Sequence, residues 1–162
     1  MVHLDESQPI IMTCNLGDSG YMLLREVNNE LGIVYESKEQ QHGFNFPYQI
    51  GTNGDDPRSA DTNAHKVENH DIVILGSDGL WDNFHKARIL DVIKPHLKAS
   101  EDGSIKDKVE QLSIEIAQLA EQYSYRHAYM SPFAESARAH NFDYIGGKPD
   151  DITVIVAQIL LK

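Results

Sequence analysis

The stretch that decides the fold of this 162-residue chain is DIVILGSDG, at residues 71–79. It opens with an apolar run without alternation, which is typical of a strand in the middle of a sheet, and GSDG then turns the chain. A second β-branched run, ITVIVAQILL at 152–161, follows the acidic pair Asp150-Asp151. If the two strands are antiparallel neighbours, the end of one lies beside the start of the other. Asp78 and Asp150 would then share one edge of the sheet.

The flanking patterns predict an α+β fold with an antiparallel sheet. Residues 10–16 (IIMTCNL) and 21–27 (YMLLREV) read as a hairpin around GDSG, and residues 33–35 continue it as a third strand. Apolar residues at steps of three and four predict a helix over 104–125. Strands that are followed by helices and then by one more strand favour α+β over alternating β–α–β units.

Other segments predict less regular structure. Residues 80–97 have helical spacing, although Pro95 should stop or kink a helix there, and a short helix is expected near 133–140. Residues 36–69 are polar and read as a flap around an aromatic island at 44–50. We expect one domain over 1–162, with a disordered start at 1–9.

Composition excludes several classes of protein. With 14 Lys and Arg against 25 Asp and Glu, the net charge is −11, which argues against binding to nucleic-acid backbones. No apolar run approaches the ~20 residues of a membrane span. The single cysteine, Cys14, excludes an internal disulfide and indicates a reducing intracellular compartment. We expect Cys14 to be a small core residue, and the chain shows no targeting segment.

Three aspartates, Asp18, Asp78 and Asp150, lie where a chain reversal meets an apolar strand. Clustered carboxylates repel one another unless a hard cation such as Mg²⁺ or Mn²⁺ lies between them. Asp-Gly and Gly-Asp pairs are also ordinary turn formers, and Asp78 could cap a helix. Position alone leaves both interpretations open.

The sequence around these aspartates resembles that of a known family. Three motifs resemble, in order, those of the metal-dependent protein serine/threonine phosphatases of type 2C: NLGDSG (15–20), VILGSDGLWDN (73–83) and KPDDITVIV (148–156). Three further stretches resemble the branch of that family whose members work in mitochondria and plastids: QQHGFNFPYQ (40–49), YMSPFA (129–134) and GGKPDD (146–151).

The resemblance implies a β-sandwich of two antiparallel sheets flanked by helices, with two Mn²⁺ or Mg²⁺ ions at one end. It implies hydrolysis of phosphoserine and phosphothreonine in a phosphoprotein substrate by metal-activated water. By matching position, Asp78 and Asp150 are ligands of one catalytic metal, and Asp18 with Asp78 holds a third, weaker metal. The compartment it implies is a mitochondrion or plastid.

The remaining candidate residues have supporting roles. Asp151 stands where many relatives have Asn, and we expect it to support the metal ligands or cap the backbone rather than bind the metal itself. Gly17 and Gly79 are expected to allow the tight turns that bring the carboxylates to the sheet edge. His42, beside the aromatic island, and Lys148, beside Asp150, are candidates for substrate access, with solvent exposure as the simpler interpretation.

The family's catalytic domain also has an N-terminal half with a phosphate-binding Arg, a Glu-Asp pair and an Asp-Gly motif, none of which is recognisable here. We therefore expect the C-terminal part of a catalytic domain, with weak or no activity by itself. Sheet faces left uncovered should favour self-association. The alternative is a non-catalytic phosphatase-like module that keeps the fold and binds a partner without turnover.

Overall fold

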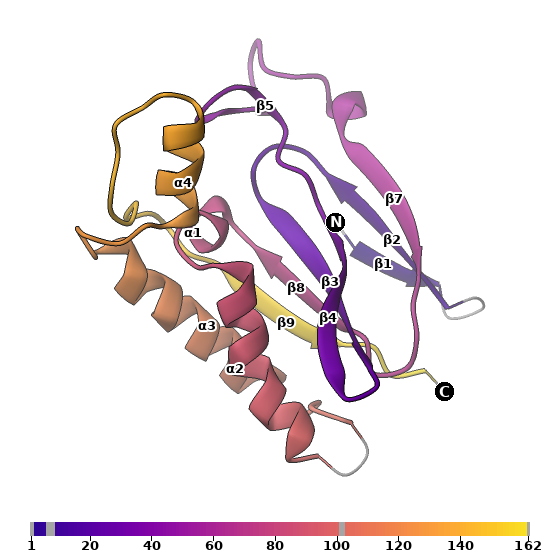
Figure 1. The fold of residues 1–162 in the computed structure, drawn as a ribbon. Coiled ribbons are helices and arrows are strands. Elements are labelled where there is room, and N and C mark those ends of the chain that lie inside the picture. Colours follow the sequence, from indigo (N-terminus) through magenta and orange to yellow (C-terminus); the bar gives the residue numbers. More distant parts are fainter. Residues whose placement is uncertain (1, 6–8, 101–102, 162) are drawn as a thin grey trace.

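The computed structural model describes residues 2–5, 9–100 and 103–161, which form two antiparallel sheets with helices on one side (Figure 1). The first sheet has the order β1–β2–β7 and the second β4–β3–β8–β9. The strands are β1 (Val2–Asp5), β2 (Ile10–Asn15), β3 (Gly20–Val27), β4 (Glu30–Glu36), β7 (Asp61–Lys66), β8 (Ile72–Gly76) and β9 (Val154–Gln158). This arrangement confirms the predicted α+β class with antiparallel sheets.

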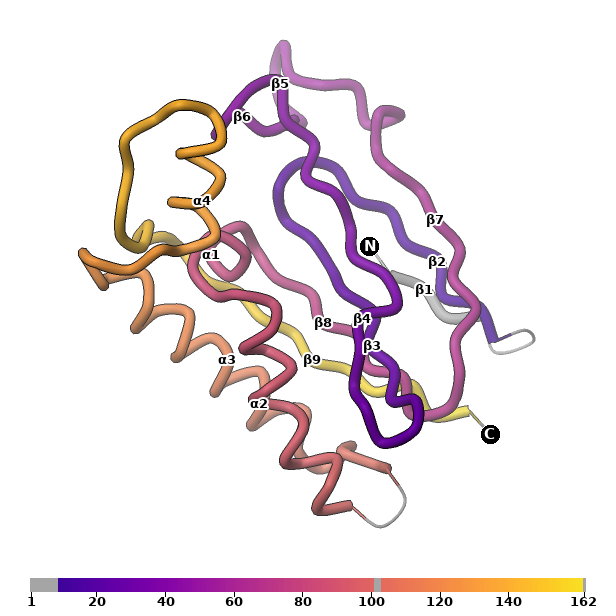
Figure 2. Tube along the Cα trace, in the orientation of Figure 1, coloured from indigo at the N-terminus to yellow at the C-terminus, as the bar shows by residue number. Residues whose placement is uncertain are grey.

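Smaller elements complete the chain between and after these strands. A two-stranded ribbon and a 3-10 turn separate β4 from β7: β5 (Gln41–Gly43), β6 (Phe46–Pro47) and η1 (Pro57–Ser59). The helices are α1 (Asp78–Trp81), α2 (Lys86–Lys98), α3 (Val109–Ser124) and α4 (Pro132–Ala139). Figure 2 shows α4 beside the β5–β6 ribbon, and α2 and α3 along the face of the second sheet that points away from β7. None of the helices in the described part of the chain is long and apolar enough to cross a membrane.

The second sheet is buried on both faces because it has a core on each side. Met22 and Leu24 of β3 belong to the larger core, which the sheet shares with the helices. Leu23, between them, belongs to a smaller core that also includes Ile11 of β2. Alternation along a strand sends successive side chains to opposite faces, so the unbroken apolar runs of β3 and β8 mark the central strands.

The helices are held by single apolar stripes, as predicted. On α3 the buried positions are Leu112, Ile116, Ala120 and Tyr123, one face of an α-helix. The helix begins at Val109 rather than at 104, and its N-cap is Lys108. Pro95 neither stops nor visibly shortens α2, which continues to Lys98. It lies in the last turn, where a missing N–H removes one hydrogen bond and little else.

The predicted hairpin of residues 10–16 and 21–27 is wrong, because β2 and β3 lie in different sheets. The connection through Gly17 passes the chain from one sheet to the other. Buried and exposed residues alternate in β2, where Met12 and Cys14 are exposed, so Cys14 is not the core residue that we expected. The pairing that does occur is β3 with β4.

Two other segments are more ordered than the sequence predicts. Residues 36–69 contain β7, which pairs with β2 over its whole length. Residues 2–5, placed in the expected disordered start, pair with β2 as β1, because the edge of β2 that β7 leaves open accepts another strand. Residues 1 and 6–8 of that start lie outside the described residues.

Candidate metal centre

The candidate site lies at one end of the second sheet, where three chain reversals meet. In the register of this sheet, Gly20 of β3 pairs with Gly76 of β8, and Gly76 pairs with Val154 of β9. The loop before β3, the turn after β8 and the loop before β9 therefore share one edge, as antiparallel pairing requires. Asp18, Asp78 and Asp150 come from these three connections, so the predicted convergence at this edge is present.

Ser77 joins the turn after β8 to the loop before β9. Its Oγ donates to the carbonyl of Asp151 at 2.9 Å and accepts from the amide of Thr153 at 3.0 Å. Gly79 then packs so closely that a Cβ there would lie 2.6 Å from the Asp151 carbonyl oxygen. Asp151 contributes through its backbone, while its side chain is exposed. These contacts bring Asp78 and Asp150 together.

Gly17 positions the third connection. Its φ of +94° is in the left-handed region, and a Cβ would lie 2.8 Å from the carbonyl oxygen of Tyr48. Its carbonyl accepts from the amide of Gln40 at 3.0 Å. The loop that carries Asp18 is thereby attached to the segment that follows β4.

Three carboxylates form the centre of the site. Asp78, Asp82 and Asp150 each place one oxygen within 4.8 Å of the others. Burial raises the pKa of Asp78 above its ordinary value, and the carboxylates of Asp150 and Asp18 raise it further, against the opposing charge of Lys148. The ionised cluster therefore needs positive charge.

Asp82 is a member of this cluster that was not among the residues predicted from the sequence, although its spacing from Asp78 indicates it. Asp78 and Asp82 are four residues apart at the start of a helical turn, which puts them on one face. Burial raises the pKa of Asp82 to about 6, although its hydrogen bond with Lys148 lowers it. Asp82 is the most enclosed carboxylate of the three, with 16% of its side chain exposed.

Lys148 lies inside the cluster and not at the solvent-exposed position that we considered the simpler interpretation. Its Nζ is 2.7 Å from Asp82 Oδ2, 3.5 Å from Asp150 Oδ2 and 3.6 Å from Asp78 Oδ2. Burial lowers the pKa of Lys148, but the three carboxylates outweigh burial and raise it overall. The ammonium is thus the local counter-ion of the acidic residues.

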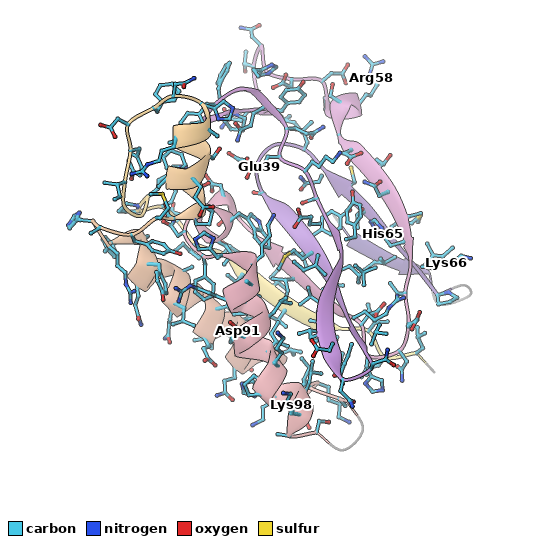
Figure 3. The ribbon with its side chains drawn as sticks, in the orientation of Figure 1. Glu39, Arg58, His65, Lys66, Asp91 and Lys98 are labelled. Atoms are coloured by element: carbon cyan, nitrogen blue, oxygen red, sulfur yellow. The ribbon has the colours of Figure 1, made fainter. Side chains whose placement is uncertain are left out.

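Asp18 lies outside this group of three but borders the same region. It lines a hollow of about 380 Å³ together with Glu39, Trp81 and Lys86, and a smaller one of about 50 Å³ that also reaches Asp82. Figure 3 shows Glu39 near the start of β3, where β4 has given way to the following loop. Glu39 is a second acidic neighbour that the sequence did not single out.

His42 is not among the residues that line either hollow. Its Nε2 is 2.9 Å from Asp55 Oδ1, and its ring stacks on Tyr48 at 4.3 Å between centroids. These contacts hold the β5–β6 ribbon to the loop that follows it. His42 therefore takes part in the packing of that segment, and its expected role in substrate access stays a prediction.

Comparisons with known proteins identify relatives for nearly the whole chain. It is 37% identical over 166 residues to the human protein phosphatase PTC7 homolog, covering 97% of this chain and 52% of that protein. It is 38% identical over 147 residues to the Arabidopsis thaliana probable protein phosphatase 2C 55, covering 90% of this chain and 29% of that protein. The chain spans about half the length of the PTC7 homologues that it matches. No protein-family model matches it.

Solved structures have the same fold. The photosystem II phosphatase PBCP superposes with a TM-score of 0.83 at 26% identity, over 99% of this chain and 63% of that one. The catalytic domain of the serine/threonine phosphatase PstP, in complex with two manganese ions, superposes with a TM-score of 0.55 at 17% identity, over 98% of this chain and 56% of that one.

Proposed function

The chain belongs to the type 2C family of metal-dependent protein phosphatases, and we propose that it takes part in the hydrolysis of phosphoserine and phosphothreonine in proteins. Asp78 and Asp150 are the proposed ligands of a catalytic Mn²⁺ or Mg²⁺. Asp18 and Asp78 are the proposed ligands of a third ion, which binds more weakly. We propose a mitochondrion or plastid as its compartment, on the resemblance to that branch of the family.

The observation that carries this proposal is the convergence of three carboxylate oxygens within 4.8 Å at one sheet edge. Carboxylate oxygen is the donor that Mg²⁺ and Mn²⁺ prefer in proteins. An ammonium group already lies among these oxygens, so the cluster accepts a cation in this arrangement. The residues present therefore fit a divalent ion.

When bound, divalent ions supply Lewis-acid activation of water and positive charge for a phosphate group. The chain's own residues supply the geometry. Ser77 and Gly79 keep the turn after β8 against the loop before β9, which places Asp78 and Asp150 side by side. The hollow lined by Asp18 and Trp81 adjoins this edge and is the proposed position for the polypeptide that flanks the phosphorylated residue.

We expect the 162 residues alone to be weakly active or inactive, because their described carboxylates converge on one metal position. An assay of phosphate release from a phosphothreonine peptide with Mn²⁺, for the chain and for Asp78→Asn, tests this expectation. Any turnover should require Mn²⁺ and fall by about two orders of magnitude in the variant. Activity that Asp78→Asn leaves unchanged would contradict the proposed role of the cluster.

A second candidate function is a phosphatase-like module that binds a partner without catalysis. The neutralisation of the cluster by Lys148 is the observation in its favour. Calorimetric titration with Mn²⁺ separates the two candidates. The enzyme proposal expects one weak site that is lost in Asp150→Asn, whereas the module proposal expects no Mn²⁺ binding that depends on Asp150.

A further inference from the structure

Lys148 is the only described side chain that brings a positive charge into contact with all three carboxylates of the cluster. The three Nζ–oxygen distances run from 2.7 to 3.6 Å. An ammonium at these distances makes charge-assisted hydrogen bonds or close ion pairs. With 22% of its side chain exposed, Lys148 is shielded from the solvent that weakens ion pairs at the surface.

The backbone of Lys148 is fixed by a buried amide. Asn83 Nδ2 donates to the carbonyl of Lys148 at 2.7 Å, and the amide of Lys148 donates to Asn83 Oδ1 at 2.7 Å. The same Nδ2 also donates to the carbonyl of Gly79 at 2.9 Å. Asn83 is fully buried, so this pair of reciprocal hydrogen bonds ties the loop before β9 to α1.

The side chain of Lys148 is guided as well as its backbone. Its Nζ lies 5.0 Å from the centre of the Phe133 ring, a distance at which the face of an aromatic ring attracts a cation. Phe133 belongs to α4, whose N-cap Ser131 is buried and accepts from the amide of Ala134 at 3.0 Å. Contacts from α1, α4 and the loop before β9 therefore converge on one ammonium position.

This position conflicts with a divalent ion at the cluster. An ion that coordinates oxygens of Asp78 and Asp150 at about 2.1 Å would lie close to the ammonium. Like charges at such a separation repel strongly in a partly buried site. The metal can gain these ligands only if the ammonium gives up its contacts with them.

We propose that Lys148 is a built-in counter-ion that competes with the divalent metal for Asp78 and Asp150 and so sets the metal affinity of the site. The inference rests on the proposed metal site. Lys148 is accordingly a residue that sets metal affinity: it stabilises the metal-free chain and weakens metal binding at the same time.

The test uses the whole chain and two variants that lose the same charge. Lys148→Met removes the counter-ion but keeps an unbranched side chain over Phe133. Lys94→Met is the control, because Lys94 pairs with Asp91 at 3.7 Å on α2, away from the cluster. Mn²⁺ affinity is measured by calorimetry, and the melting temperature is measured in a chelator.

We expect Lys148→Met to lower the Kd for Mn²⁺ by about tenfold, which is the effect of losing one partly buried competing ion pair. In the chelator its melting temperature should fall below that of wild type. In saturating Mn²⁺ its melting temperature should lie above that of wild type. Lys94→Met should match wild type in Kd. Lys148→Arg, which retains the charge, should keep the melting temperature in the chelator.

The experiment distinguishes failure of the counter-ion role from failure of the proposed metal site. If wild type and Lys148→Met bind Mn²⁺ with the same Kd and Asp78→Asn abolishes binding, the site stands and the counter-ion role is overturned. If no variant binds Mn²⁺, the metal site fails. In that case a Lys148→Met chain as stable as wild type in the chelator overturns the counter-ion role as well.

Discussion

Gly79 is a residue at which close packing leaves no room for a side chain beside the site. A Cβ there would lie 2.6 Å from a backbone oxygen of Asp151 and 2.9 Å from Cγ1 of Ile152. Only a movement of α1 or of the loop before β9 could make room. The separation of Asp78 from Asp150 thus depends on a residue without a side chain.

We predict that Gly79→Ala destabilises the chain by about 2 kcal/mol, the usual cost of overfilling a packed contact. It should also weaken Mn²⁺ binding, because the two ligand-bearing segments separate. Gly32→Ala is the control, since no atom lies within 4 Å of a Cβ at that position. Urea unfolding measures the stability of the two variants, and calorimetric titration measures their Mn²⁺ binding. Equal stability for the two variants would contradict the packing at Gly79.

His65 introduces a pH-sensitive contact between the sheets. Its Nε2 is 3.0 Å from the hydroxyl of Tyr21, which also lies 2.6 Å from Thr13 Oγ1. Figure 3 shows His65 on β7, next to β4, and its ring is 4.2 Å from that of Tyr35. Burial lowers the pKa of His65, with the charge of Asp61 opposing the effect.

Because the folded pKa is depressed, the unfolded chain takes up a proton at this residue before the folded chain does. The contribution of His65 to stability is therefore complete above its ordinary pKa of about 6.5 and declines as the pH falls below it. Between pH 7.5 and 5.5, wild type should lose more free energy of unfolding than His65→Gln. The control His127→Gln, at an exposed position, should follow wild type. A larger loss of free energy of unfolding in His65→Gln than in wild type would contradict this prediction.

At the scale of elements, α3 offers a comparison of two isoleucines on one helix. Ile116 is fully buried in the core against the second sheet, whereas Ile114 is 51% exposed. Ile116→Ala should cost about 3 kcal/mol, since it removes buried groups and leaves a cavity. Ile114→Ala should change stability by less than about 1 kcal/mol. Similar losses in urea unfolding would mean that α3 does not pack as described.

The strands also show how much of the fold could be predicted from the sequence. The run that became β8 is apolar without interruption, so its central place was predictable, and the β-branched run that became β9 made their antiparallel pairing predictable. β7 (DTNAHK) was not, because it is a polar strand without a fully buried residue. Its partner β2 alternates between buried and exposed residues while β3 is buried at four consecutive positions. That contrast distinguishes a strand with one exposed face from a strand with a core on both faces, and it fits the placement of β2 and β3 in different sheets.

The site was predictable to a similar degree. Asp78 and Asp150 follow from strand pairing, and the convergence of Asp18 follows from the neighbouring position of β3. Asp82 and Lys148 were missed as partners because their contact joins residues 66 positions apart through the side of a short helix. No local pattern in the sequence indicates such a contact, which depends on the hydrogen bonds that the buried side-chain amide of Asn83 makes with Lys148.

At the scale of the whole molecule, helices cover one face of the second sheet and the β1–β2–β7 sheet covers the other only in part. Ile155, on the edge strand β9, is 52% exposed and points to the same face as its pairing partner Leu75. An exposed strand edge with apolar side chains is a site of association between chains.

We therefore predict self-association of this chain at micromolar concentration. Light scattering should give a mass above that of one chain that increases with concentration, and Ile155→Lys should shift it toward one chain. Val27→Lys, at an exposed residue of β3, serves as the control with the same gain in charge. One chain's mass at every concentration of wild type would contradict this prediction.

The proposed function of this chain requires a divalent ion between the carboxylates of Asp78 and Asp150. Anomalous scattering from a crystal of the chain soaked in Mn²⁺ tests this most directly. We predict a peak about 2.1 Å from an oxygen of each, with the ammonium of Lys148 moved away from its position among the three carboxylates. A Mn²⁺ peak elsewhere, with this cluster still holding Lys148, would contradict it.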